Sequence, residues 1–409
     1  MPQTERAYVP TRRYDLQLTI KDKDYTSDLY QLRLVSSLNS PYQIIRMSLF
    51  VDPDDIILEK LFGKDPIKLN VRLLGDDEQV SEQVDFNLMY IRGSFQINSR
   101  ASVSGSQQNK ERSTFTITTI CRDAFKTVTF PVNAVYLDTT VKGVIEDLAS
   151  KSGASVEIDS QDANSEVIDQ LVIPPTTLKK AIDYLDKRFG IFSGAGVCFC
   201  RYDNKLFVKN ITSKMKGNQT FTVYQLSTDI DNYEVIKKCN DGKNFYTYTP
   251  IDTNYVGNEK FSVEAKTEHY LMTPRDELYY MITKDVKDVS RQYGVIYQSN
   301  KIDSDDSALS NREKSFEDPC GYERSDTFTI AKIAKYTANL ATMSILIERN
   351  MPILNLMNVG EAVKLNSQIV EFTDLSGKYI LKSSDINFHK QRDWQTTCRL
   401  DLIRTNQTI

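Results

Sequence analysis

The most regular alternation of apolar and polar side chains lies near the C-terminus, in the segment that ends at Ile403. One face of this segment carries Trp394, Thr396, Cys398, Leu400 and Leu402, and the other carries Gln395, Thr397, Arg399, Asp401 and Ile403. A period of two residues is typical of a half-buried strand. We therefore expect a strand whose tryptophan side lies in the core and whose Gln395, Arg399 and Asp401 side faces water.

Two shorter apolar segments precede this strand, Ala362 to Leu365 and Lys378 to Leu381, and a turn that ends at Gly377 separates them. A longer run that begins at Ala331 has the pattern of a helix, and Met351-Pro352 should end it because proline cannot continue a helix. The block 331–409 is thus predicted to be a helix laid against the strands of a small antiparallel sheet, or barrel.

The same alternation recurs in the N-terminal third of the chain. It predicts strands at 14–20, 30–34, 45–51, 67–73, 86–90 and 115–119. A short helix is expected from Asp52 to Gly63, since aspartate can cap it, Pro53 suits its first position and glycine can end it. The polar run from Arg100 to Glu111 indicates a hairpin tip. Residues 1–130 are therefore predicted to form an N-terminal arm and a first, small β-barrel.

After Pro131 the pattern changes to a mixture of helices and strands. Thr139 or Thr140 can cap a helix that Gly153 ends, and a strand follows at 155–158. Pro174-Pro175-Thr176-Thr177 begins a second helix, which Gly190 ends. A hairpin of strands 197–200 and 206–208 crosses the turn Tyr202-Asp203-Asn204. Residues 131–212 are therefore predicted to be a compact α+β module.

Signals are weaker from 213 to 330, a region predicted to be strand-rich. Strands are expected at 221–224, 245–248, 260–271, 277–281 and 295–297, and an acidic loop at 300–312. No internal repeat of fixed period is present in the sequence. The predicted fold class of the whole chain is α+β, mostly β.

Composition narrows the class of protein. A chain of 409 residues suggests two to four domains. Its 40% apolar and 26% charged residues are those of a globular protein. A formal net charge of -4 argues against nucleic acid as the main partner. The N-terminus is polar and no apolar stretch reaches the ~18 to 20 residues that span a bilayer, so we expect neither a signal peptide nor a membrane-spanning segment.

The six cysteines indicate the compartment in which the chain folds. They stand at positions 121, 198, 200, 239, 320 and 398, without a Cys-x-x-Cys spacing. Cys198 and Cys200 would share one face of a strand, where neighbouring side chains are poorly placed to form a disulfide. We expect reduced, buried thiols and folding in the cytoplasm.

No pattern in the sequence predicts catalysis, a cofactor or a metal. His269 and His389 stand alone, which is too few ligands for zinc. The segment 303–307 begins like a calcium loop, but Ala308 and Lys314 occupy positions that need glycine and glutamate. No phosphate-binding or nucleophile-elbow motif is present. The abundant carboxylates and aromatic residues are explained by helix ends and core packing.

Two stretches resemble a known family. In 135–211, the helix openings at Thr139-Thr140-Val141 and Pro174 to Leu178 and the strand Lys205-Leu206-Phe207-Val208 look like a helical insertion module. The second stretch runs from Val359-Gly360-Glu361-Ala362-Val363 through Leu375 to Ile380 and closes with Leu400 to Arg404. Together they cover about a third of the chain. They resemble the baseplate hub, or tail hub, proteins of contractile-tailed bacteriophages, which are related to the hub part of type VI secretion spike proteins.

The resemblance implies a structural protein of the virion baseplate. It implies a homotrimer in which two tube-protein-like barrels per subunit form a pseudo-sixfold ring that adapts the sixfold tail tube to the threefold central spike. The implied partners are further copies of the chain, the tail tube protein, the central spike protein and neighbouring baseplate proteins, with nucleic acid only passing through the lumen. It also implies that strands from about 213 to 240 return to complete the first barrel.

Two other functions remain open from the sequence. The carboxylates and the tail context would suit a virion-associated peptidoglycan hydrolase. The aromatic content would suit a glycan-binding tail module, with Tyr279-Tyr280 as a candidate contact.

Overall fold

We analysed a computed structural model of the chain. The residues that the structure describes are 12–51, 58, 60–75, 78–96, 113–160, 163–165, 167–192, 196–211, 214, 217–228, 232–239, 241–255, 268–271, 280–283, 296–298, 341–348, 351–369 and 376–404.

The described part of the chain has many strands and few helices, so it is mostly β, as predicted. Most of these strands belong to one large sheet. The first seven strands are β1 (Arg13–Ile20), β2 (Lys23–Asp24), β3 (Leu29–Ser37), β4 (Ile44–Val51), β5 (Ile67–Leu74), β6 (Val80–Gln96) and β7 (Ser113–Cys121). The others are β13 (Phe221–Gln225), β14 (Asn244–Thr247), β15 (Asp252–Tyr255), β19 (Ala341–Glu348), β20 (Ala362–Ser367), β21 (Gly377–Lys390) and β22 (Trp394–Arg404). The N-terminal and C-terminal strands predicted from the period-two pattern are all present.

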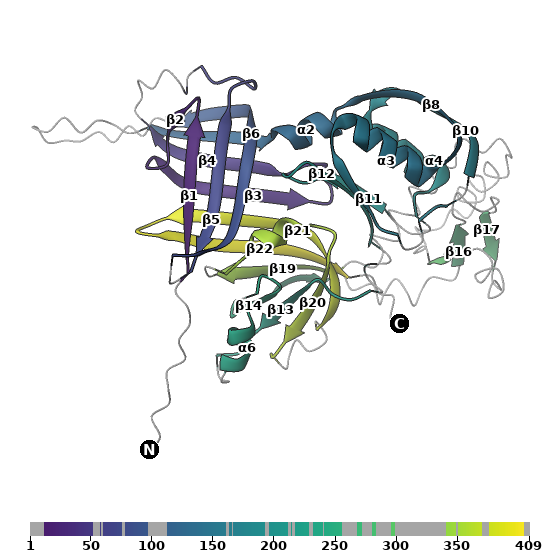
Figure 1. The fold of residues 1–409 in the computed structure, drawn as a ribbon. Coiled ribbons are helices and arrows are strands. Elements are labelled where there is room, and N and C mark those ends of the chain that lie inside the picture. The colour runs from purple at the N-terminus through teal and green to yellow at the C-terminus, as the bar shows by residue number, and fades with distance from the viewer. Residues whose placement is uncertain are drawn as a thin grey trace, which may run out of the picture.

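The N-terminal strands are joined to each other through the C-terminal ones. Antiparallel pairing runs from β1 through β5, β6, β7, β4 and β3 to β21 and β22, and it returns to β1 where Tyr14 lies opposite Trp394. In Figure 1 the purple and blue strands stand above the yellow pair that closes this path. The alternating inward residues of all eight strands therefore share one core.

A second set of strands is built on the other ends of the same two C-terminal strands. β20 pairs with β21, β19 pairs with β22, and β15 pairs with β19. β13 lies parallel to both β20 and β14. The hydroxyl of Thr247 in β14 donates to the carbonyl of Leu346 in β19, which brings the two ends of this set together. Strands β21 and β22 are thus common to both sets, as Figure 1 shows.

Two predictions about these strands are wrong. The strand at 221–225 pairs with β14 and β20 and not with any of β1 to β7, so it does not complete the first set. The predicted helix from Ala331 to Met351 is contradicted at 341–348, which is strand β19, while its first ten residues lie outside the described part. Ile345 and Ile347 are buried and Ser344 and Leu346 are half-buried, which is the period of a strand.

Residues 131–212 contain two helices between two small sheets. Helix α3 (Val141–Ser152) and helix α4 (Leu178–Phe189) pack against the ribbon of β8 (Pro131–Thr140) and β10 (Val167–Thr177). They also contact the sheet of β9 (Ser155–Ile158), β12 (Lys205–Asn210) and β11 (Gly196–Cys200). Figure 1 shows the helices framed by these strands.

The predicted ends of both helices are confirmed. The Thr140 hydroxyl accepts from the Gly143 amide at 3.1 Å, and Gly153 ends α3 with a left-handed φ of 78°. Thr177 precedes α4 and Gly190 follows it. The hairpin β11–β12 and strand β9 also lie where the pattern placed them.

Several elements were missed because their signals are weak. These are ribbon strands β8 and β10, helices α2 (Arg122–Val128) and α6 (Tyr233–Lys238), and the 3-10 helix η1 (Leu354–Met357). The ribbon strands carry apolar residues on their outer face, which breaks the alternation expected of a half-buried strand.

Other predictions fall largely outside the described residues. Leu58 is helical, but most of the predicted helix 52–63 is not described, nor are the loops 100–111 and 300–312. From the weak middle region the backbone of one small sheet is described, with β16 (Glu268–Leu271) between β17 (Tyr280–Thr283) and β18 (Ile296–Gln298).

Candidate assembly site

The described residues contain no evident centre for chemistry. No group of three or more His, Cys, Asp or Glu side chains is placed to hold a metal in this part of the chain. No helix among the described residues is long and apolar enough to cross a membrane. His389 stands on the outer face of β21, whereas the His269 side chain, Tyr279 and the segment 303–307 lie outside the described residues.

The cysteines behave as the sequence predicted, as far as they are described. Cys121, Cys198, Cys200, Cys239 and Cys398 are free and buried, and Cys320 lies outside the described residues. Burial raises the pKa of Cys198 and of Cys200 to about 12, so both remain thiols at neutral pH. The described cysteines therefore pack as small core residues.

Among the described residues, the most buried ion pair joins residues 131–212 to the second set of strands. Lys209 lies on β12 with a side chain only 2% exposed, and its ammonium group donates to the carboxylate of Glu361, which is 14% exposed. The same ammonium group donates to the Val359 carbonyl at 3.3 Å. Lys214 lies 3.6 Å from the other oxygen of Glu361, so two cations share one carboxylate.

The backbone near Glu361 is shaped for this contact. Gly360 has a left-handed φ of 80°, and a Cβ there would lie 3.3 Å from Cδ of Lys209. The Gly360 amide donates to the Leu381 carbonyl at 2.8 Å, which fastens this turn to β21. The Lys209 ammonium also lies 4.8 Å from the centroid of the Phe207 ring. Glycine lets the two segments of the chain approach closely enough for the buried pair to form.

The ionisation of the pair is set by its surroundings. Burial lowers the pKa of Lys209, and the carboxylate of Glu361 opposes part of that effect. Burial works to raise the pKa of Glu361, but the charge of Lys209 and the hydrogen bonds from Lys209 and Thr220 outweigh it and hold this pKa below its usual value. Removing Glu361 would leave the buried Lys209 ammonium group without its carboxylate, whereas removing Lys209 would leave Glu361 with Lys214 and Thr220 as its remaining partners.

The contact between Lys209 and Glu361 connects the two stretches that carry the family resemblance. Lys209 belongs to the first stretch and Glu361 to the second. Sequence reasoning did not single out the pair, because the only signal is a lysine among apolar residues in the Leu206 to Asn210 strand. The partners are 152 positions apart in the sequence, so no local pattern shows their contact.

A second set of hydrogen bonds links the N-terminal strands to helix η1 and the residues just before it. The Tyr14 hydroxyl donates to the Met351 carbonyl at 2.6 Å and accepts from the Ile353 amide at 3.2 Å. The Leu354 amide donates to Glu82 at 3.4 Å. Burial raises the pKa of Glu82 to about 7 despite these backbone hydrogen bonds. This carboxyl group therefore changes its charge near neutral pH.

Two solved structures that resemble this chain over most of its length are tail proteins. The tail protein from Neisseria meningitidis MC58 aligns with a TM-score of 0.51 and 12% identity, covering 95% of this chain and 96% of that one. The 43 kDa tail protein of prophage MuSo2 from Shewanella oneidensis aligns with a TM-score of 0.50 and 11% identity, with the same coverage. The chain therefore has the fold of phage tail proteins.

The family follows from the sequence. The model of the bacteriophage PBS1 gene 109 protein family matches residues 87–312, more than half of the chain, and the chain belongs to this family. The predicted resemblance to phage tail proteins is thereby confirmed. A type VI secretion system component from E. coli also aligns, with a TM-score of 0.42 and 9% identity over 98% of this chain and 78% of that one. No curated protein matches.

Proposed function

We propose that the chain is a structural baseplate hub protein without enzymatic activity, forming a homotrimeric ring that adapts the sixfold tail tube to the threefold central spike. The observation that carries this proposal is the pairing path of the large sheet. It closes on itself through β21 and β22, and the second set of strands grows from the same pair. This supports two barrels per subunit, and three subunits would then present six barrels.

The proposal assigns a place to each part of the chain. The first barrel comprises the strands within residues 1–130 closed by β21 and β22, and the second comprises β13, β14, β15, β19 and β20 on that same pair. Residues 131–212 form the inserted module, which the Lys209 and Glu361 pair fastens to the second barrel. The middle region 213–330 contributes β13, β14, β15 and the small sheet of β16 to β18.

The partners follow from the same role. One end of the ring would bind the tail tube protein and the other the central spike protein, while other baseplate proteins surround it. The family and fold of phage tail proteins support a location in the virion baseplate. The buried free thiols support folding in the host cytoplasm before assembly.

The mass of the purified protein in solution tests this function. Light scattering after size exclusion should give three times the 46.8 kDa of one chain at micromolar concentration, either alone or after mixing with the spike or tube protein. A chain that stays monomeric under all three conditions would contradict the proposed ring.

A further inference from the structure

One wall of the first strand set has an unusual composition. This wall comprises β3, β4, β7 and residues 89–96 of β6, and we call it the arginine wall. It contains Arg33, Arg46 and Arg92 but no lysine, aspartate or glutamate, in a chain with 26% charged residues. The cores of protein interfaces are enriched in arginine, methionine and aromatic residues and depleted of lysine and acids. The composition is therefore that of an interface.

The three arginines lie in one row across the strands. Arg33 is directly opposite Arg46, Arg46 is opposite Thr118, and Thr118 is opposite Arg92. Neighbouring strands are about 4.8 Å apart, so Arg33 and Arg46 are adjacent. Like charges directly opposite each other on a sheet are destabilising. A row of this kind costs stability in the free subunit.

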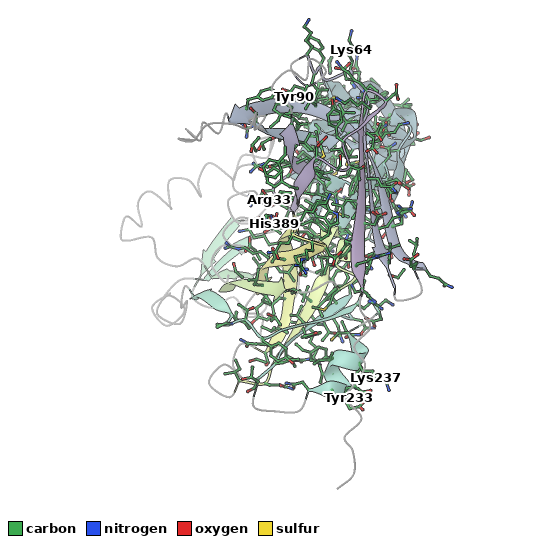
Figure 2. The ribbon with its side chains drawn as sticks, turned by 90° about the vertical axis from the view of Figure 1, so that its left-hand side faces the viewer. Arg33, Lys64, Tyr90, Tyr233, Lys237 and His389 are labelled. Carbon is green, nitrogen blue, oxygen red and sulfur yellow. The ribbon has the colours of Figure 1, made fainter. Side chains whose placement is uncertain are left out.

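Two of the three arginines have no acid to neutralise them within the described residues. Arg33 has one, since its Nε donates to Asp385 on β21 at 2.7 Å. Arg46 and Arg92 make no ion pair in the part of the chain that the structure describes, and Nε of Arg46 is buried there without a hydrogen-bond partner. Figure 2 labels Arg33 beside His389, at the margin where β3 meets β21. The unpaired charges therefore lie away from that margin, toward β6.

The rows on either side of the arginines are suited to contact with another protein. One flanking row is apolar: Val35 on β3, Ile44 on β4 and Met89 on β6 are half-buried, and Ile120 on β7 lies buried between Ile44 and Met89. Farther along, Phe50 is 38% exposed and stacks on Tyr30 with ring centroids 4.0 Å apart. These side chains would bury apolar and aromatic area around the arginines.

The opposite wall of the same strand set has a different character. Several outward charges of β1 and β5 have acid partners, as Arg72 has in Asp15 and Arg13 has in Glu78, just before β6, at 2.6 Å. A mosaic of paired, exposed charges is typical of a surface that stays in water. Both walls come from one closed set of strands, so the shape of the sheet does not explain why only one lacks acids.

We propose that the arginine wall binds a second copy of this chain, whose carboxylates pair with Arg46 and Arg92. This inference rests on the proposed ring and names the surface through which neighbouring subunits meet. The wall carries three positive charges whereas the chain has a formal net charge of -4, so the rest of each copy carries seven excess negative charges to offer. Apolar and aromatic rows with Asp385 beside the arginines favour a protein over a phosphate backbone.

Charge reversal within the full chain tests this surface. We expect Arg46→Glu and Arg92→Glu to turn the trimer into monomers whose circular dichroism matches that of the unaltered subunit, since each places a negative charge where carboxylates bind. Arg92 is exposed at the rim, so its variant folds even if Arg46→Glu does not. Lys68→Glu is the matched control, because Lys68 is exposed on the opposite wall and makes no ion pair within the described residues. It should remain trimeric.

Each other outcome is decisive. If both arginine variants remain trimeric like the control, this surface is not the subunit contact, although the ring stands. If the unaltered chain is monomeric with and without its spike or tube partner, the ring fails together with this inference. If the unaltered trimer binds a short DNA duplex at physiological ionic strength and Arg46→Glu abolishes that binding without changing the mass, the wall recognises nucleic acid and the inference is wrong.

Discussion

At the scale of single residues, the Lys209 and Glu361 pair shows how a buried charge depends on its partner. Glu361→Gln should lower the free energy of unfolding by about 3 kcal/mol, because it leaves the ammonium group buried without its carboxylate. Lys209→Met with Glu361→Gln should cost less than the sum of the two single changes. Urea unfolding of the four proteins of this double-mutant cycle, at one fixed protein concentration, measures the coupling. Additive effects would mean that the pair does not fasten the module.

Glu82 gives a pH dependence whose sign can be worked out. Its pKa is about 7 in the fold against an ordinary 4.5, so the fold favours the protonated carboxyl group. The stabilisation is complete below the unfolded value and is lost as pH rises from there to about 7. Glu82→Gln cannot ionise, so its stability relative to the unaltered chain should rise by up to about 3 kcal/mol over this range.

Thermal or urea unfolding of both proteins at several pH values between about 5 and 8 measures this difference. The comparison of the two proteins cancels the titration of all other groups. A difference in stability that stays constant across these pH values would show that Glu82 ionises as readily in the fold as in the unfolded chain.

At the scale of elements, β21 and β22 are the strands on which both sets depend. A chain that ends at residue 376 lacks both, so β1 and β3 each lose a partner strand and the path can no longer close. We expect such a chain to lack a cooperative unfolding transition, because open sheet edges and a divided core remain. Thermal unfolding followed by near-ultraviolet circular dichroism measures this loss.

A chain that ends at residue 404 is the control for this truncation. It keeps every strand of the large sheet and should unfold cooperatively like the complete protein. Adding residues 341–409 as a separate polypeptide to the shorter chain should restore the transition. Native-like unfolding of the shorter chain by itself would show that β1 to β7 form an independent unit.

The elements themselves were predicted unevenly, for a physical reason. Strands with one buried face, such as β1 and β22, follow the alternation of their side chains and were located correctly. Strand β19 was mistaken for part of a helix because the consecutive apolar residues Ile345 to Ile347 suit either structure. Only pairing with β22 on one side and β15 on the other selects the strand.

At the scale of the whole molecule, the two walls of the first strand set differ: the wall of β1 and β5 is suited to face water, and the arginine wall is suited to bind another subunit. The arginines on the wall of β1 and β5 have acid partners, whereas the arginine wall leaves Arg46 and Arg92 without acids among the described residues. A ring of subunits would neutralise those charges by association. The mass of the trimer and its response to charge reversal on each wall therefore test the assembly and its geometry separately.

The sequence alone determined the local elements: the faces of β22, the caps of α3 and the burial of the described cysteines. These features depend on residues only a few positions apart, so short sequence patterns predict them. The tertiary structure alone decided which strands pair, as when Tyr14 meets Met351 across 337 positions or when β21 joins β3. Long-range contacts of this kind also form the Lys209 and Glu361 pair and the row of arginines. No local pattern encodes such contacts, because many strand pairings would satisfy the same alternation of side chains.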